Sequence, residues 1–498
     1  MIHENDRKEK GFMKKRQMKA AVAAVLLASV FMTACKTGTD TDGRIPEQKE
    51  QQEAQPDGEA EEQQEVLQPG AKAEIQTDKE KTPEEQSALF LPDYTSAPLL
   101  NTTDIKCLSM EAGASDDQVQ LNWFSPSGKR GKTEWKNSSG KTESFEAECT
   151  ASVTEPGLYV NKAVVSGLRR GESYTYRVGN EDAWSPEYTY KIPEKTGIFT
   201  FLVTSDAQIG QSEIEYPEDT AGRWDSVLTR LRSYVPEAEL LLHLGDQVAD
   251  FGSTEHYELF LEHLALYGIP LAPVVGNHDV ANETSMEAGG HPDGPYFYEH
   301  FFVPNRSNMA EGEYDQNGNY AFVRGDVLFI VLNGCYGHPG EFHEAYAAQI
   351  ASVFPDVKWR IVMQHYSPYS GVGSSGNGMS DDYLANITID NDIDLVLTGH
   401  DHAYSRSAFI NREKETLEEY DYEPGSTAVN PEGAMYVTCS TSSGCLYHPL
   451  EKEEHLVFQG QPETPVAVRI DVTDKELHLR TYLVETWTLY DEYTIRKE

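Results

Sequence analysis

The sequence predicts an α/β sandwich over residues 195–498, preceded by a small all-β sandwich over residues 91–194. In the first span, short segments of alternating apolar and polar residues are separated by Gly, Ser, Asn and Pro, which is typical of antiparallel strands. From residue 197 onward, apolar strand-like runs alternate with segments of helical periodicity. Polar side chains directly follow several of these runs, and open α/β sheets place their sites at the carboxyl ends of strands.

Length and charge limit the classes of function. At 498 residues the chain is long enough for two or three domains. It has 82 Asp and Glu against 41 Lys and Arg, a formal net charge of -41. This balance argues against a nucleic-acid partner bound through a basic surface, because phosphate contacts require Lys and Arg.

The first 35 residues have the features of an export signal. A basic segment at 13–19 precedes an apolar run at 20–31, which is too short to span a bilayer. Met32-Thr33-Ala34-Cys35 follows and resembles a bacterial lipoprotein cleavage box, in which the cysteine is lipidated. The alternative is an ordinary signal peptide with an incidental cysteine. We expect Cys35 to anchor an exported protein to the cell membrane, facing outward.

Residues 36–90 are rich in Glu, Gln, Asp and Thr and have few aromatic residues. Such a segment cannot bury enough apolar surface to offset the entropy of ordering. The composition predicts a disordered acidic tether, and an acidic interaction tail is the alternative.

The span 91–194 is predicted to be the β-sandwich. Val119, Leu121 and Trp123 alternate with polar residues, which favours a half-buried strand with Trp123 in the core. The span resembles the fibronectin-III-like N-terminal domain of purple acid phosphatases through its segments 166–168, 174–179 and 184–185.

The span 195–498 is predicted to alternate strands and helices. Strands are expected at 199–204, 239–244, 271–275, 327–332, 360–363, 393–397, 433–439, 466–472 and 476–483. Helices are expected at 224–234 and 255–266.

The chain is organised around the run at 271–275 and the Gly276-Asn277-His278-Asp279 that follows it. Asn277 can offer an amide oxygen to a metal ion, and His278 can exchange a proton near neutral pH. Taken alone, these residues are also compatible with a simple turn.

Metal-type side chains follow five predicted strands. They are Asp206 with Gln208, Asp246, Asn277 with His278, His365, and His400 with His402. A lone Asp at such a position is usually a turn residue and a lone His a partly buried imidazole, but their joint occurrence favours a site. Carboxylate, imidazole and amide donors suit Fe, Mn or Zn. A bridging carboxylate could hold two such ions about 3.5–4 Å apart, as in two-metal phosphoryl chemistry.

The order of these motifs resembles that of the calcineurin-like metallophosphoesterase superfamily. The segment 399–406, Gly-His-Asp-His-Ala-Tyr-Ser-Arg, is close to its purple acid phosphatase form. The resemblance implies that Asp246 bridges two ions, that Asp206 and His402 bind the first, and that Asn277, His365 and His400 bind the second. It also implies that His278 is the acid at the leaving group. Tyr404 and Arg406, in the same segment, are predicted to bind substrate.

The sequence departs from this pattern at three places. Purple acid phosphatases place a metal-binding tyrosine shortly after the bridging Asp, and residues 247–250 contain none, so a tyrosinate-to-iron colour is not expected. Many relatives have Asp-x-His in the first motif, and here Gln208 takes the place of the histidine. The sequence leaves three roles open for its side chain: binding a metal directly, binding one through a water molecule, or only filling space. The histidine pair that plant enzymes carry after the fourth motif is also missing, so their substrate contacts cannot be transferred.

The predicted function is dinuclear metal-dependent hydrolysis of phosphate monoesters at the cell surface, with Asp250 or Asp279 orienting His278. The alternatives are a phosphodiesterase on the same metals and a surface binding protein with an inert phosphoesterase domain. Export permits disulfides. Cys107 with Cys149, and Cys439 with Cys445, are possible pairs that the sequence does not decide.

Overall fold

The computed structural model describes residues 104–181, 183–211, 217–280, 296–307, 319–335, 340–372 and 381–498. The predicted signal with Cys35, and the predicted tether at 36–90, lie outside these residues. In the described part of the chain, no helix combines the length and the apolar character that a membrane crossing requires.

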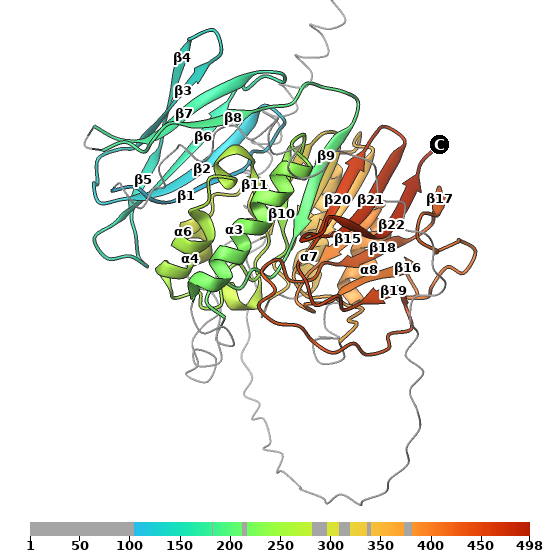
Figure 1. Cartoon of the computed structure of the whole chain (residues 1–498). Coiled ribbons are helices and arrows are strands. Elements are labelled where there is room, and N and C mark those ends of the chain that lie inside the picture. Colours follow the sequence, from blue (N-terminus) through green and yellow to red (C-terminus); the bar gives the residue numbers. More distant parts are fainter. Residues whose placement is uncertain are drawn as a thin grey trace, which may run out of the picture. The chain divides into compact units, whose positions relative to one another are not determined.

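The N-terminal region is all β, as predicted (Figure 1). Its strands are β1 (Lys106–Ala112), β2 (Gln118–Ser125), β3 (Lys132–Asn137), β4 (Thr142–Glu146), β5 (Glu148–Ala151), β6 (Tyr159–Ser166), β7 (Ser173–Gly179) and β8 (Tyr188–Lys191). One sheet has the order β4-β3-β7-β8, and β1, β2, β6 and β5 pair in the other. Both contribute to one core, where Trp123 is buried and Trp135 stacks on Tyr176 with ring centroids 4.7 Å apart.

The C-terminal region contains fourteen further strands in the part of the chain described. They are β9 (Phe199–Thr204), β10 (Leu240–His243), β11 (Leu271–Pro273), β12 (Tyr320–Arg324), β13 (Val327–Val331), β14 (Trp359–Met363), β15 (Leu395–Thr398), β16 (Tyr404–Ile410), β17 (Thr427–Val429), β18 (Ala434–Thr438), β19 (Leu456–Gly460), β20 (Val466–Val472), β21 (Glu476–Leu483) and β22 (Thr488–Arg496). The helices are α3 (Pro217–Tyr234), α4 (Thr254–Leu261), α6 (Tyr296–His300), α7 (Gly340–Val353) and α8 (Asp381–Asp390), with single 3₁₀ turns η3 (Leu266–Gly268) and η4 (Asn277–Asp279).

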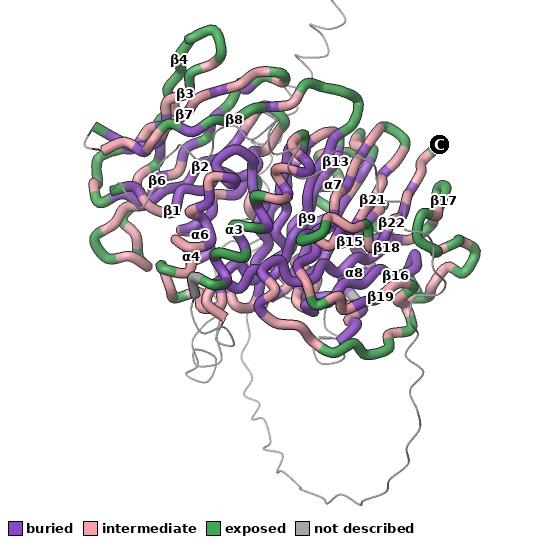
Figure 2. The backbone as a smooth tube through the Cα atoms, viewed as in Figure 1, coloured by how far each residue is buried: buried purple, intermediate pink, exposed green. Residues whose placement is uncertain are grey.

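Two sheets pack face to face between helices, which confirms the predicted α/β sandwich. One sheet contains β17-β22-β21-β20-β9-β10-β11, and the other has the order β12-β13-β14-β15-β18-β16-β19. Phe201 of β9 meets Phe329 of β13 edge to face at 5.4 Å, which places these strands against each other. The neighbouring Leu328 and Ile330 instead share a core with α7 and α8, because side chains alternate between the faces of a strand. Figure 2 shows this buried interior running through the strands.

The predicted strands match the structure closely, whereas both predicted helices differ in extent. The strands expected at 199–204, 466–472 and 476–483 have those bounds, and the remaining predicted strands differ by one or two residues at most ends. The helix expected at 224–234 ends as predicted but begins earlier, since α3 starts at Pro217. The single helix expected at 255–266 was wrong in extent, since α4 ends at Leu261. Glu262 leaves the helical conformation at φ −81° and ψ 55°, and only a 3₁₀ turn follows.

The two predicted domains share a sheet. β1 pairs in parallel with β11, so hydrogen bonding continues from the N-terminal region into the sheet that carries Asn277. Side chains of β1 and β2 also reach the end of α6: Ser109 Oγ donates to His300 O at 2.8 Å, and Gln120 Nε2 donates to Phe302 O at 2.7 Å. The N-terminal region is therefore joined to the C-terminal region by backbone pairing and by side-chain hydrogen bonds.

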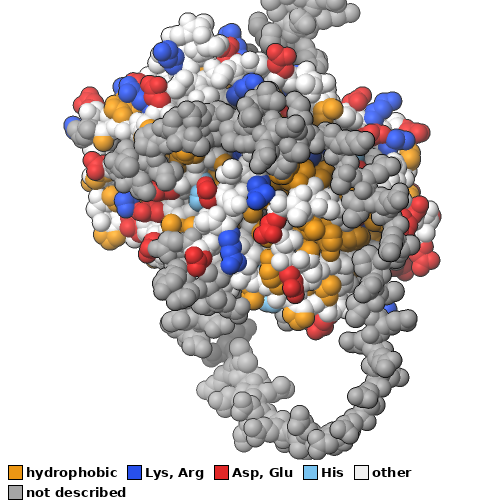
Figure 3. Space-filling view, in the orientation of Figure 1, with side chains coloured by type: hydrophobic (Ala, Val, Ile, Leu, Met, Phe, Trp, Pro, Cys, Tyr) orange, Lys and Arg blue, Asp and Glu red, His pale blue; other side chains and the backbone are white. Residues whose placement is uncertain are grey.

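No single acidic patch dominates the face of the molecule that Figure 3 shows. Acidic and basic side chains are interspersed there, and hydrophobic side chains gather on the right of the view.

Candidate metal centre

Five strands deliver the predicted ligands to one place. β9, β10 and β11 run parallel in one sheet and end just before Asp206, Asp246 and Asn277. β14 and β15 run parallel in the other sheet and end just before His365 and His400. Because the carboxyl ends of parallel strands lie at the same edge, the side chains that follow them converge.

Two glycines of the motifs permit this close approach. A Cβ on Gly276 would lie 2.1 Å from both the backbone nitrogen and Oδ1 of Asp246. A Cβ on Gly399 would lie 2.1 Å from Ser205 Oγ and 2.7 Å from Asp206 Oδ2. Glycine is therefore required by packing both directly before Asn277 and directly before His400.

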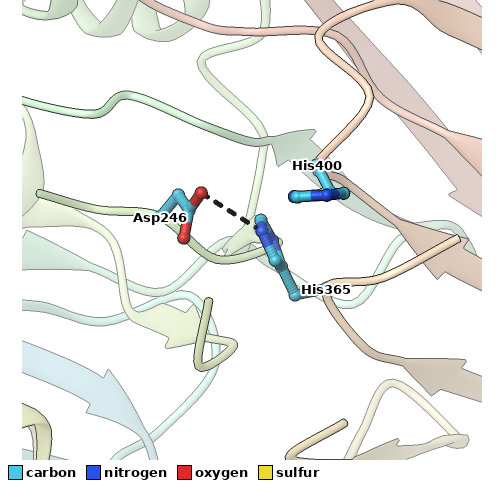
Figure 4. A group of neighbouring side chains, drawn as sticks. All are labelled: Asp246, His365 and His400. Carbon is cyan, nitrogen blue, oxygen red and sulfur yellow. Dashed lines mark ion pairs between the residues drawn. The ribbon is translucent and has the colours of Figure 1, made fainter. Parts of the chain in front are cut away.

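The orientation of His365 is compatible with its predicted role as a ligand of the second ion. Its Nδ1 lies 2.8 Å from Leu244 O, and because a carbonyl oxygen only accepts, Nδ1 carries the proton. Its Nε2 is then left to face Asp246 Oδ2 at 3.2 Å and Asn277 Oδ1 at 3.0 Å. Figure 4 shows Asp246 and His365 directed at each other with His400 beside them, and potential ligand atoms of these three lie within 4.8 Å of one another.

A second group forms around Asp206, on the side expected for the first ion. His402 Nδ1 lies 3.0 Å from Leu446 O, so its Nε2 faces Asp206 Oδ1 at 3.3 Å. Asp206 Oδ1 is buried and has no hydrogen-bond partner among the described residues. A buried carboxylate oxygen without a donor is costly unless a cation or another group meets it, so this donor set fits a metal ion.

Backbone strain is concentrated at the same residues. The left-handed region, which side chains other than glycine rarely occupy, is adopted by Asp206 (φ 49°), Gln208 (φ 36°), Asp246 (φ 52°), His400 (φ 71°) and His402 (φ 52°). Such conformations cost of order 1–3 kcal/mol each and cluster at functional sites. The fold thus holds the predicted ligands in positions that local preference would not give.

The carboxylates and the burial of the centre shift the pKa values of its histidines in different directions. Burial alone would lower the pKa of His365, but the Asp246 carboxylate, together with Asp206, raises it to about 9. Burial lowers the pKa of His400 to about 3, and the nearby His365 adds to the effect. The carboxylates therefore favour a positive charge at this position, which a bound cation would also supply.

Gln208 presents nitrogen, and not oxygen, to the centre. Its Nε2 donates to Asp246 Oδ2 at 3.1 Å, while its Oε1 lies 3.3 Å from Gln211 Nε2 and 3.4 Å from Cys445 Sγ. An amide nitrogen is not a metal ligand, so this orientation favours a hydrogen-bonding role over direct binding.

His278 is placed beside the bridging carboxylate, and a carbonyl orients its ring. Its backbone N–H donates to Asp246 Oδ1 at 2.8 Å, and its Nδ1 lies 3.0 Å from Ala249 O. Since Nδ1 must donate to this carbonyl, Nε2 is the atom that can exchange a proton with a substrate. The Ala249 carbonyl thus takes the orienting role that we expected of Asp250 or Asp279.

The carboxylates of Asp279 and Asp250 instead accept hydrogen bonds from backbone N–H groups. Asp279 is fully buried and accepts hydrogen bonds from the N–H groups of Gly276, Asp246, Gln247 and Val248 at 2.7–3.4 Å. It therefore ties the loop after β10 to the loop after β11. Asp250 accepts a hydrogen bond from Gly252 N at 3.0 Å.

The prediction that Tyr404 and Arg406 bind substrate was wrong. Both side chains are 0% exposed, which leaves no surface for a substrate. Arg406 pairs with Asp491 through Nε at 2.7 Å and Nη2 at 3.0 Å, and Tyr404 OH donates to the same carboxylate at 2.8 Å. These residues hold β16 against β22, and their role is structural.

Sequence reasoning missed two neighbours of the centre. The five cysteines in the described residues are all free thiols, so neither possible disulfide forms. Cys445 instead lies 3.9 Å from His402 Nδ1, and the ring of His448 lies 5.3 Å from that of His402. No motif spacing marks either residue, since the segment after β18 reaches the centre only through the fold.

Comparisons with known proteins agree with this geometry. Residues 199–404 match the family model described as calcineurin-like phosphoesterase, and residues 108–192 match the purple acid phosphatase N-terminal domain. No curated protein sequence matches the chain.

The solved structures that share this fold include two with TM-scores above 0.5. The purple acid phosphatase PPD1 from yellow lupin (Lupinus luteus) seeds superposes with a TM-score of 0.64 at 16% identity, covering 80% of this chain and 75% of that one. The structure of PhoD superposes with a TM-score of 0.51 at 14% identity, covering 77% of this chain and 91% of that one. With both domain models matched in order, the chain combines a purple acid phosphatase N-terminal domain with a calcineurin-like phosphoesterase domain.

Proposed function

We propose that the protein hydrolyses phosphate monoesters with two metal ions, and that Fe, Mn or Zn fills the centre. The observation that carries this proposal is the convergence of two groups of donors, Asp206 with His402 and Asp246 with Asn277, His365 and His400. Cations held by these groups would offset the charge of a phosphoryl group and activate water.

The chain's own residues supply the remaining steps. Asp246 has one oxygen held by the His278 N–H and the other near His365 and Gln208, so it is fixed between the two groups. His278 Nε2 delivers a proton to the departing oxygen, as its orientation by Ala249 O allows. The complete donor set does not favour the alternative of an inert phosphoesterase domain.

Metal analysis and paired assays test this function. Protein purified without added metal should contain two transition-metal ions per chain by mass spectrometry. It should hydrolyse an aryl phosphate faster than a bis-aryl phosphate, and it should show no absorption band from tyrosinate and Fe(III). Preference for the bis-aryl substrate would indicate a phosphodiesterase. Protein that stays inactive on both esters after Fe, Mn or Zn has been supplied would indicate the inert alternative.

We also propose that the enzyme is exported and anchored through Cys35, because the segment 32–35 has the form of a lipoprotein box. Cys35→Ser should release the protein from membranes or block its processing. Fractionation and sequencing of the mature terminus measure this. An unchanged terminus with unchanged membrane association would contradict the anchor.

A further inference from the structure

The segment 441–446 reaches the centre from β18, a strand that is followed by no predicted ligand. β18 pairs in parallel with β15, so both strands end at the same edge of their sheet. His400 and His402 follow β15 at this edge, and residues 441–446 follow β18. The segment therefore lies where the topology brings the metal-type side chains together.

This segment contacts both residues that we expect to bind only the first ion. Thr441 Oγ1 donates to the backbone oxygen of Asp206 at 2.7 Å. Leu446 O lies 3.0 Å from His402 Nδ1, which leaves Nε2 of that ring to face Asp206 Oδ1 at 3.3 Å. In the described part of the chain, the hydrogen bonds of this segment reach none of the side chains assigned to the second ion alone.

Asp206 needs support because its backbone is strained. Its φ of 49° lies in the left-handed region, which a residue other than glycine keeps only where the surrounding structure holds it. Its amide nitrogen donates to Gly245 O at 3.1 Å, and its carbonyl oxygen accepts from Thr441 Oγ1. Ser442 N donates to the oxygen of the preceding residue, Ser205, at 2.8 Å. Thr441 is 0% exposed, so its hydroxyl bonds to this carbonyl away from solvent.

We propose that Thr441 is a positioning residue for the first metal ion. Its hydroxyl fixes the strained backbone of Asp206 and so directs Oδ1, which has no hydrogen-bond partner among the described residues, toward that ion together with His402. The second ion has other supports, since Leu244 O orients His365 and Asp279 holds the loop of Asn277. This inference rests on the proposed function, because it assigns separate supports to the two ions proposed there.

Titration of metal-stripped protein with Zn²⁺ tests the inference. Thr441→Val replaces the hydroxyl by a methyl group and leaves the carbonyl of Asp206 without this donor. Groups that orient a metal ligand typically contribute 10–100-fold to metal affinity. By titration calorimetry, the Kd of one Zn²⁺ ion should rise roughly 10–100-fold, and the Kd of the other should stay at the wild-type value. Thr441→Ser, which keeps the donor, should recover the lost affinity.

Double variants identify the weakened site. His402→Ala removes a predicted ligand of the first ion, and His365→Ala removes one of the second. When Thr441→Val is added to His402→Ala, the ion that remains should bind as it does in His402→Ala alone. When Thr441→Val is added to His365→Ala, the ion that remains should bind more weakly. A general loss of stability would not distinguish the two backgrounds.

Thr388→Val is the matched control. Thr388 is also buried, and its Oγ1 donates to Ala385 O at 3.0 Å within α8, outside the segments that carry predicted ligands. This variant loses the same kind of hydrogen bond and should bind both ions as wild type does. Circular dichroism shows whether each metal-free variant is folded. If Thr441→Val is not, Thr441→Ala removes the hydroxyl without adding a methyl group.

Wild-type affinity at both sites, equal weakening of both, or weakening of the second site alone would overturn the inference. If wild type binds two ions and hydrolyses no ester, the proposed function fails, and the titrations still decide the role of Thr441. Wild-type protein that binds no Zn²⁺ would overturn both.

Discussion

We expect the substitution Asp279→Asn to disrupt the metal centre, although Asp279 is not a predicted metal ligand. Asp279 Oδ2 accepts from the N–H groups of Gly276 and Asp246, and Oδ1 accepts from those of Gln247 and Val248. An asparagine has one acceptor oxygen, so its NH₂ group would face two buried N–H donors. At roughly 1–3 kcal/mol for each stranded donor, the free energy of unfolding should fall by about 2–6 kcal/mol.

The same substitution should weaken metal binding. Groups that hold a ligand in place typically contribute 10–100-fold to metal affinity or activity, and Asp279 holds the backbone of both Asp246 and the Asn277 loop. We expect Asp279→Asn to lose metal on dialysis under conditions in which wild type retains two ions. Mass spectrometry of bound metal and denaturant unfolding measure the two effects separately.

Asp394→Asn is a suitable control for general destabilisation. Asp394 is also a largely buried carboxylate, and it accepts from Arg360 N at 2.9 Å and pairs with Lys497 at 2.5 Å. It should lose stability and keep its metal. If Asp279→Asn retains two ions with wild-type affinity, Asp279 supports the fold alone.

The sequence allowed us to predict which side chains would converge, because each candidate ligand follows a buried strand. The strands before Asp206, Asp246 and His365 are short, largely apolar and buried, which marks them as strands in the sequence. The strained φ angles and the glycine contacts explain why the ligands meet, but both depend on neighbours from other strands and were not visible in the motifs.

The errors arose where a role depends on tertiary contacts. Tyr404 and Arg406 adjoin the ligand motif in sequence, yet strand alternation and Asp491 turn them into the core. Asp279 adjoins His278, yet its carboxylate points back to four backbone N–H groups. His448 was missed for the opposite reason, since it lies far from any motif in sequence and near His402 in space.

Removing the imidazole of His278 should slow the reaction without removing a metal ion. The expected loss in kcat for His278→Ala is roughly 10²–10⁴-fold, the usual contribution of a positioned acid. The metal content should stay at that of wild type, because the contact of His278 with Asp246 is made by its backbone N–H, which alanine keeps. Asn277→Ala provides the comparison, because it removes the oxygen next to His365 Nε2 and should lower occupancy of the second ion.

Dependence on the leaving group identifies the role of His278. Nitrophenolate departs without a proton, whereas an alkyl alkoxide must be protonated as it leaves. The loss in His278→Ala should therefore be large for an alkyl phosphate and small for nitrophenyl phosphate. Misfolding would lower both rates by the same factor, and a weakened metal site would appear in the metal analysis. Equal losses on both substrates with two ions bound would show that His278 does not donate the proton. Because Nδ1 is committed to Ala249 O, Nε2 is the nitrogen from which that proton must come.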